Sequence, residues 1–263
     1  MKLKIPNKYF AAAILLMVVA AVFIAFAVTT PLGEFITAAF VISGMICAIT
    51  GIFTLTFSGG EPMDPRLVGI LPVQGCMNLC RIATDLGING NAYFLPPRMT
   101  GEARVMQFNP TLRYTGNHVS IQGSFPKTEP TGLVTIPSCD PLIRDMRKKN
   151  ALIIPDSEKP LTRLLQETVT DYFEFAPRVS IRWHADSVTV TLHRYRFIAG
   201  CQFIVQESPG CCLKNPCPLC SLCGALLAEG TNKVVALEQC SLSPSLRDIN
   251  LVFLILPVRD SHP

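Results

Sequence analysis

The feature that most constrains this chain is a pair of long, uncharged apolar runs near its N-terminus. No charged residue lies between Lys8 and Glu34, or between Glu34 and Glu61. Each run supplies the roughly 20 apolar residues that a helix needs to cross a hydrocarbon core about 30 Å thick. Because a helix satisfies its own backbone hydrogen bonds in lipid, we predict that residues 10–57 engage a bilayer as two helices. The expected transmembrane helices are 10–30 and 35–57.

The charges that flank these runs predict the orientation of the chain. Lys2, Lys4 and Lys8 precede the first run, whereas the turn at 29–34 contains neither Lys nor Arg. The positive-inside rule then places residues 1–9 and the domain that follows the two helices in the cytoplasm, with the turn outside. We therefore expect an integral membrane protein whose main domain is cytoplasmic.

A cleaved signal peptide is the alternative interpretation of the first run, with Ala25-Phe26-Ala27 as its cleavage site. The apolar region is longer than the usual 7–15 residues, and a second run follows at once, so we favour an anchor. Neither run contains an ionisable acidic or basic group, so the sequence gives no support for an ion path or a transport role.

The second run carries a face of small residues. Ser43, Cys47 and Gly51 recur at four-residue spacing, which allows close approach of two helix backbones. We expect this face to pack against Ala21 and Ala25 of the first helix. A homo-oligomer formed through the same face is the alternative.

The rest of the chain has the composition of one folded domain, 67–263, which follows a Gly- and Pro-containing linker at 58–66. Three of the 23 basic residues and one of the 19 acidic residues precede residue 58, which leaves 20 and 18. A balance so close to neutral does not predict a nucleic-acid partner, since nucleic-acid binding favours clustered basic patches.

Apolar periodicity predicts an α+β domain in which helices pack on a mixed or antiparallel sheet. Helices are expected at 74–86, 141–149, 161–175 and 219–229. Strands are expected at 67–73, 91–95, 104–108, 119–125, 132–136, 179–184, 187–195, 196–206, 233–237 and 250–256. The strands 179–184 and 187–195 form a hairpin around Ala185-Asp186 in this prediction, with Val179, Ile181 and Trp183 across from Val188, Val190 and Leu192. Asp140 is the expected N-cap of the second helix.

The common motifs of nucleotide binding and hydrolysis are absent from the sequence. There is no GxxxxGK[ST], no GxGxxG after a strand, no HExxH and no GxSxG. The four histidines (118, 184, 193 and 262) are scattered, and His184 and His193 have no identifiable nucleophile as a partner. We therefore expect a binding or scaffold domain rather than an enzyme.

The densest chemistry is the cysteine-rich loop 211–223, which contains five thiols. The candidate metal ligands are Cys212, Cys217, Cys220 and Cys223. Spacings of four, two and two residues let such a loop wrap four thiolates round one centre, either Zn or an iron–sulfur cluster. Zn sites usually draw on two separated segments, and Cys201 or Cys240 could supply a distant ligand.

Two other interpretations of the loop stay open. Cys217-Pro-Leu-Cys220 is a possible redox pair, because the amides and dipole of a helix N-terminus stabilise a thiolate. A CPxC that opens a helix is similar to glutaredoxin-like proteins, although there the motif follows the first strand of the domain. Alternatively, the cysteines are small apolar residues that fill a helix–sheet contact. A reducing cytoplasm argues against a disulfide framework for the eleven cysteines.

With these elements in place, the chain resembles an uncharacterised family of archaeal membrane-associated proteins. The two-helix anchor, the helix 161–175 with the following VSIRWHADSVTVTL hairpin, and the closing PCPLCSLCGALLAEGTNKVV segment carry the resemblance. It is most specific at 216–230. The resemblance implies the architecture and draws attention to Cys217, Cys220 and Ser221, but it implies no activity.

The function predicted from the sequence is a membrane-tethered cytoplasmic binding or scaffold domain, with a structural metal in the cysteine loop as one option. The alternative function is a membrane-bound thiol redox protein that uses Cys217 and Cys220.

Overall fold

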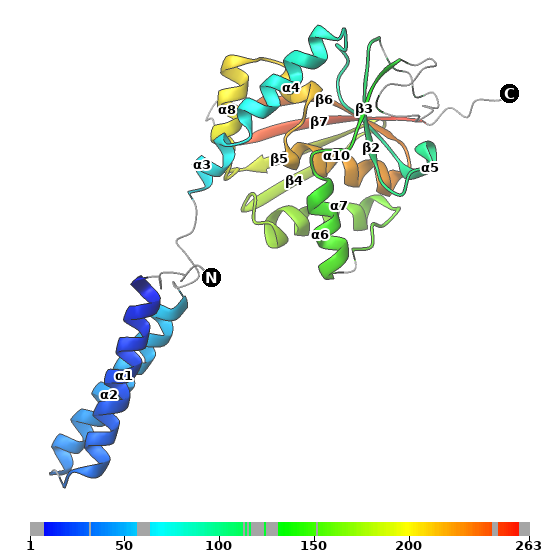
Figure 1. Cartoon of the computed structure of the whole chain (residues 1–263). Coiled ribbons are helices and arrows are strands. Elements are labelled where there is room, and N and C mark those ends of the chain that lie inside the picture. Colours follow the sequence, from blue (N-terminus) through cyan, green and yellow to red (C-terminus); the bar gives the residue numbers. More distant parts are fainter. Residues whose placement is uncertain are drawn as a thin grey trace. The chain divides into compact units, whose positions relative to one another are not determined.

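The computed structural model describes residues 8–31, 33–56, 64–112, 114, 116, 124, 131–150, 152–243 and 247–257. The chain divides into two compact units, Met1–Met63 and Asp64–Pro263 (Figure 1). The strand predicted at 119–125 lies outside the described residues, apart from Ser124.

The first unit contains two apolar helices, α1 (Lys8–Thr29) and α2 (Glu34–Thr56), packed against each other. At 1.5 Å per residue, helices of 22 and 23 residues are about 33 and 35 Å long, which matches the thickness of a hydrocarbon core. Both are long and apolar enough to span a membrane. Large apolar side chains such as Leu15 and Phe53 are exposed on their outer faces, as contact with lipid requires.

Small residues bring α1 and α2 together. Ala13, Ala20 and Ala27 are buried on α1 at seven-residue spacing, and Gly44 and Gly51 are buried on α2 with the same spacing. A Cβ atom on Gly44 would lie 3.3 Å from the carbonyl oxygen of Ala20, and one on Gly51 would lie 3.4 Å from that of Ala13. The absence of side chains at these glycines therefore allows the close approach of the two helices.

The predicted small-residue face of α2 is used within this helix pair. Gly51 is buried in the contact, and Ser43 and Cys47 are half-buried. The predicted partners on α1 are wrong, since Ala21 and Ala25 are both exposed. The contact on α1 repeats every seven residues rather than every four.

The second unit is built on a seven-stranded antiparallel sheet with the strand order β3-β2-β1-β6-β7-β5-β4. The strands are β1 (Tyr93–Leu95), β2 (Met106–Pro110), β3 (Gly132–Thr135), β4 (Arg178–Trp183), β5 (Ser187–His193), β6 (Val234–Leu242) and β7 (Ile249–Leu256). In β5, Val188, Val190 and Leu192 are buried and alternate with half-buried polar residues, so one face of the strand lies on the core. The predicted α+β fold is confirmed, and the sheet is antiparallel.

Six helices of the second unit form two groups (Figure 1). The helices of this unit are α3 (Pro65–Ile70), α4 (Val73–Asp85), α5 (Pro97–Thr100), α6 (Asp140–Asn150), α7 (Glu158–Glu167) with the π-helical turn η2 (Thr168–Tyr172), α8 (Ile198–Glu207), α9 (Cys211–Lys214) and α10 (Pro218–Thr231). One group consists of α6, α7 and α10, and α10 also contacts β1, β6 and β7. In the other group, α3 and α4 pack against α8.

The central helix of the second unit is α10, in which eleven of 14 residues are buried. It lies between the sheet on one side and α6 and α7 on the other. Gly224 allows its close approach to the sheet, because a Cβ atom there would collide with the ring of the fully buried Phe94. The stretch 211–231 is also apolar enough to span a membrane, but most of it is buried within the protein. Its apolar character is therefore explained by the core.

Two of the predicted strands are helical. The stretch 67–73 belongs to α3 and the start of α4, and most of 196–206 is α8. A short apolar run does not distinguish a strand from a buried helix. Here α3 and α8 cross at two glycines, since a Cβ atom on Gly200 would collide with the carbonyl oxygen of Gly69. This contact between distant segments is not visible in either run alone.

Other predicted boundaries shift by a few residues. The helix predicted at 161–175 begins at Glu158 and ends in the π-helical turn at Tyr172. Asp140 is the first residue of α6 rather than its cap, and the carbonyl of Cys139 accepts the hydrogen bond from the Ile143 N–H (3.1 Å).

A buried amide pair holds the segment that carries the cysteines against the sheet. On β2, Gln107 Nε2 donates to Asn109 Oδ1 (2.9 Å), and Asn109 Nδ2 donates to the carbonyl oxygen of Lys214 (2.7 Å). Buried amides need such partners, so these contacts fix the end of α9. α10 begins four residues later, at Pro218.

Candidate functional site

All eleven cysteines are free thiols, and all lie in the described part of the chain. Five of them form a group that we call the thiol cluster: Cys201 on α8, Cys212 on α9, Cys217 and Cys220 at the start of α10, and Cys240 on β6. Their side chains are linked by hydrogen bonds in the order Cys201–Cys217–Cys220–Cys240–Cys212. The fold thus gathers thiols from four elements at one end of α10.

Two members of this cluster, Cys217 and Cys220, lie at the start of α10. Cys217 is the N-cap residue, and Pro218 occupies the first helical position, where its missing N–H leaves no donor unused. The carbonyl of Cys217 accepts the Ser221 N–H (2.9 Å), which closes the first turn. The Sγ atoms of Cys217 and Cys220 lie 3.5 Å apart.

Hydrogen bonds from neighbouring thiols hold the pKa of Cys217 well below its usual value. The largest cause is the hydrogen bond from Cys201, followed by the one from Cys220. The backbone N–H groups of Cys220 and Leu219 also favour the thiolate, whereas burial opposes it. The Cys217 side chain does not, however, form a helix-capping hydrogen bond with either of these N–H groups. The Tyr195 hydroxyl also hydrogen-bonds to Cys217, and burial raises the pKa of that phenol, so it remains a donor.

The proton of the pair stays on Cys220, because its hydrogen bonds to Cys217 and Cys240 raise the pKa of the Cys220 thiol well above its usual value. Cys240 also ionises readily: hydrogen bonds from Cys212 and Cys220 lower its pKa to about 5, while the charge of Cys217 acts in the opposite direction. Two neighbouring thiolates repel each other. We assign the single negative charge to Cys217. Thiol hydrogen bonds favour the thiolate at both Cys217 and Cys240, but the backbone N–H groups of the helix favour it only at Cys217.

The predicted ligand set is Cys212, Cys217, Cys220 and Cys223. The structure brings Cys217 and Cys220 together, and it places Cys212 beside Cys240. Cys223 lies one turn further along α10, where it is fully buried beside Cys139. Among the residues that the structure describes, no group of three or more His, Cys, Asp or Glu side chains is arranged to hold a metal ion. The Zn or iron–sulfur site therefore stays a prediction.

An apolar cavity of about 260 Å³ lies beside the cluster. Its walls come from α3, α4, α8 and the first turn of α10, together with the aromatic residues Phe175, Tyr195 and Phe197. Cys201 and Cys217 line it, so a small apolar group in the cavity would lie next to the ionised thiol. Sequence reasoning missed this cavity, because two of its helices, α3 and α8, were predicted to be strands.

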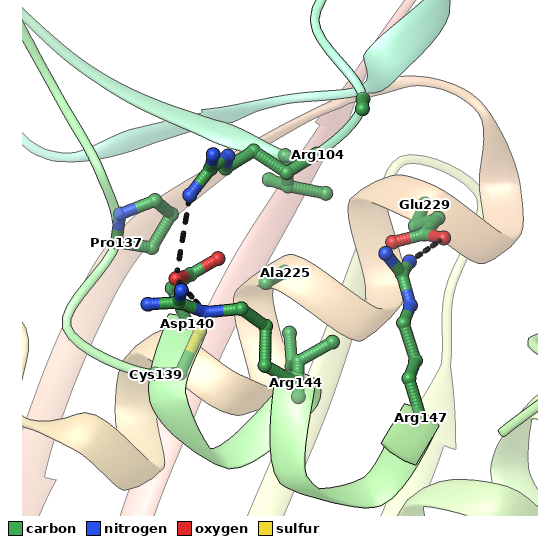
Figure 2. Close-up of a pocket in the computed structure, with 11 residues that line it drawn as sticks. Arg104, Pro137, Cys139, Asp140, Arg144, Arg147, Ala225 and Glu229 are labelled. Carbon is green, nitrogen blue, oxygen red and sulfur yellow. Dashed lines mark hydrogen bonds and ion pairs between the residues drawn. The ribbon is translucent and has the colours of Figure 1, made fainter. Parts of the chain in front are cut away.

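A second cavity, of about 200 Å³, is lined by arginines and carboxylates (Figure 2). Arg144 Nε lies 2.8 Å and Arg104 Nη1 lies 3.5 Å from Asp140 Oδ2, and Arg147 forms an ion pair with Glu229 on α10. Asp140 Oδ2 forms no well-aligned hydrogen bond among the described residues, so its contacts with Arg104 and Arg144 are ionic. Since carboxylates of the protein already occupy these guanidinium groups, we interpret this cavity as an ion-pair network that joins α6 to α10.

The expectation that His193 lacks a nucleophile as a partner is wrong. Ser180 Oγ lies 3.0 Å from His193 Nε2, and Asp248 Oδ2 lies 3.2 Å from His193 Nδ1. These residues come from β4, β5 and the residue before β7, so the sequence alone could not bring them together.

The comparisons with known proteins show the family of this chain. Residues 6–243 match the family described as Domain of unknown function (DUF7982), and the chain belongs to this family. The match includes the N-terminal helix pair, the thiol cluster and the sheet as far as β6. No curated protein and no solved structure gave a significant match.

Proposed function

We propose that the chain is a membrane-anchored dithiol protein in which Cys217 and Cys220 interconvert between two thiols and a disulfide. The family to which the chain belongs has no assigned activity, so the proposal is argued from the site itself. The observation that carries the proposal is the 3.5 Å separation of the two sulfurs, with the ionised one beside an apolar cavity. A thiolate is the nucleophile of thiol–disulfide exchange, and a neighbouring thiol is needed to complete it.

The geometry supports a two-step exchange with a disulfide substrate. The Cys217 thiolate attacks one sulfur of the substrate, which breaks its S–S bond and releases one thiolate. Cys220 then gives its proton to that leaving group and attacks the Cys217 sulfur, which releases the second half of the substrate as a thiolate that takes a proton from water. The substrate gains two electrons and the protein forms the Cys217–Cys220 disulfide, and the reverse sequence would oxidise a dithiol.

Reaction of the full-length protein in lipid nanodiscs with dipyridyl disulfide tests this mechanism by its stoichiometry. We expect wild type to release about two thiopyridone molecules per chain in the fast phase, because Cys220 displaces the second one. Cys220→Ser should release about one and keep the mixed disulfide, and Cys217→Ser should lack the fast phase. Equal fast phases in wild type and Cys217→Ser would refute the proposal.

A structural metal is the second candidate, and the convergence of five thiols at the start of α10 favours it. Metal binding requires deprotonated thiols and stabilises the folded state. Elemental analysis of protein purified without oxygen distinguishes the two functions. About one Zn or iron per chain, lost in Cys217→Ser and Cys220→Ser but kept in Cys47→Ser, would replace the dithiol function. A small fraction of one metal per chain would end the metal hypothesis.

For the membrane, we propose that α1 and α2 span the bilayer with the N-terminus and the second unit in the cytoplasm. The support is the three lysines at the N-terminal end, Lys2, Lys4 and Lys8, and the length and apolar surface of both helices. An impermeant maleimide applied to intact cells should label a Gly33→Cys variant, since no atom crowds that position. Labelling of native Cys217 from outside would contradict this orientation.

A further inference from the structure

On the polar face of the β4–β5 hairpin, Ser180 contacts His193, and Asp248, the residue before β7, contacts the same histidine. Ser180 Oγ lies 3.0 Å from Nε2 of His193, and the opposite ring nitrogen, Nδ1, lies 3.2 Å from Asp248 Oδ2. A nucleophile next to a base, with that base oriented by a carboxylate, is the arrangement of nucleophilic hydrolases. It is separate from the thiol cluster and does not depend on it.

We propose that Ser180, His193 and Asp248 form a nucleophilic serine site that hydrolyses esters carrying a negatively charged group. The sheet register places the first two residues. Ser180 pairs with Thr191 across the hairpin, and His193 pairs with Arg178, so Ser180 and His193 are diagonal neighbours on one face. All three members of the site are half-buried, which leaves them accessible to a substrate.

Asp248 is held in place by backbone contacts. It precedes β7, and its Oδ1 atom accepts the Arg194 N–H (2.9 Å), while its own N–H donates to Ser243 Oγ (3.2 Å). Arg194 has a left-handed backbone (φ 52°), which is uncommon for a residue other than glycine. The Arg194 N–H is the largest cause that lowers the pKa of Asp248, so this carboxylate stays ionised at neutral pH.

These contacts define the role of each residue. Asp248 accepts the Nδ1–H of His193, which leaves the Nε2 lone pair free to accept the Ser180 proton. Ser180 then attacks the ester carbonyl, and His193 passes the proton to the leaving alcohol. Water, deprotonated by His193, cleaves the acyl-serine and restores Ser180. One ester and one water give one acid and one alcohol.

Two arginines define the class of substrate. Arg178 and Arg182 lie two residues on either side of Ser180, so they share its face of the strand about 7 Å away. Both are exposed, and neither forms an ion pair with any residue in the described ranges. Guanidinium groups stabilise a developing oxyanion and bind carboxylates or phosphates. An ester with an anionic group near the scissile bond fits this surface.

The alternative is that the three side chains only form a hydrogen-bond chain that stabilises the sheet. Reactivity separates the two cases, because a structural serine is no more nucleophilic than any other. We therefore expect a fluorophosphonate probe to label Ser180 in the full-length protein in nanodiscs. His193→Gln should slow this labelling about 100-fold, the usual contribution of a general base, whereas His184→Gln should not change it. His184 is the matched control, because it lies in the same hairpin and pairs with Ser187 through its backbone.

Absence of labelling at Ser180, or equal labelling in wild type and His193→Gln, would overturn the proposal. Thermal unfolding of each variant checks that the fold is kept. If His193→Gln does not fold, Asp248→Asn tests the same site. The Asp248→Asn variant should label at Ser180 about tenfold or more slowly than wild type, because the imidazole of His193 loses its orientation.

The substrate class is tested with two nitrophenyl esters, neutral 4-nitrophenyl acetate and the anionic mono-4-nitrophenyl succinate. Wild type should favour the anionic ester by about tenfold, the effect of one charge-assisted contact of about 1.4 kcal/mol. The variant Arg178→Gln with Arg182→Gln should lose this preference but keep probe labelling at Ser180. A preference for the neutral ester, or the same preference in the variant, would overturn the assigned class.

Discussion

The first two turns of α10 carry cysteines in opposite chemical states. In the first turn, Cys217 borders a cavity and receives hydrogen bonds from two thiols, which lower its pKa well below the usual value. In the second turn, Cys223 is fully buried, and burial raises its pKa to about 12. The two residues share one helix and are six positions apart. The difference shows that neighbouring hydrogen-bond donors and burial, rather than the residue type, set the pKa of each thiol.

The largest expected effect is the difference in alkylation rate between these two cysteines. At pH 7 a thiol with a pKa of about 12 is ionised in about one molecule in 10⁵, whereas the lowered pKa of Cys217 raises its ionised fraction well above that of an ordinary thiol. We expect iodoacetamide to modify Cys217 more than about a thousandfold faster than Cys223. Peptide mass spectrometry over time measures both rates in one sample. Similar alkylation rates at the two positions would contradict the difference in pKa between Cys217 and Cys223.

The pH dependence of the same reaction gives an internal check. The rate for an ordinary thiol falls about tenfold per pH unit below its pKa of about 8.5. The lowered pKa of Cys217 should keep its rate constant from pH 8.5 down to at least neutral pH. A tenfold loss between pH 8 and pH 7 would show that Cys217 has an ordinary pKa.

The next effect concerns the packing that buries the second turn. Gly224→Ala would force a Cβ atom into the ring of Phe94, which is fully buried. We expect a loss of about 2–3 kcal/mol in the free energy of unfolding. Denaturant unfolding followed by the fluorescence of Trp183, the only tryptophan, measures it.

Gly75→Ala is the matched control for that variant. Gly75 also lies within a helix, but a Cβ atom there would have no atom within 4 Å. We expect a gain of about 0.5–1 kcal/mol from the higher helix propensity of alanine. Equal losses in the two variants would show that the contact with Phe94 is not the cause.

The smallest effect is the response of stability to alkaline pH. Burial raises the pKa of Cys139 and of Cys223 to about 12. Above about pH 9 these thiols lose protons when the chain unfolds but keep them in the folded state, so stability falls as pH rises. Each contributes a slope of about 1.4 kcal/mol per pH unit. Cys223→Ala should reduce the measured slope by that amount, and an unchanged slope would contradict the raised pKa.

The sequence was sufficient where the determining contacts are local. Two uncharged runs of membrane length predicted α1 and α2, and alternation predicted the β4–β5 hairpin with its register, in which Val179 pairs with Leu192. The same register already places Ser180 and His193 on one face. The missing signal was Asp248, which reaches the hairpin only because β7 pairs with β5.

The sequence was not sufficient where a contact between distant segments decides the structure. The run 196–206 is rich in aromatic and β-branched residues, which favour a strand, but the crossing of Gly200 over Gly69 makes it a helix. That helix places Cys201 against Cys217 and so supplies the hydrogen bond that contributes most to the lowered pKa of Cys217. The CPxC pair could be recognised from the sequence, whereas this contact with Cys201 could not.

The most direct test of the dithiol function is identification of the first disulfide that the full-length protein forms. The protein is equilibrated in nanodiscs with increasing ratios of oxidised to reduced dithiothreitol, and remaining thiols are alkylated under denaturing conditions before peptide mapping. We expect a mass loss of about 2 Da and a single internal bond between Cys217 and Cys220 before any other cysteine is oxidised. A first disulfide that involves other cysteines, or a Cys217–Cys220 pair that stays reduced while they oxidise, would contradict the proposed function.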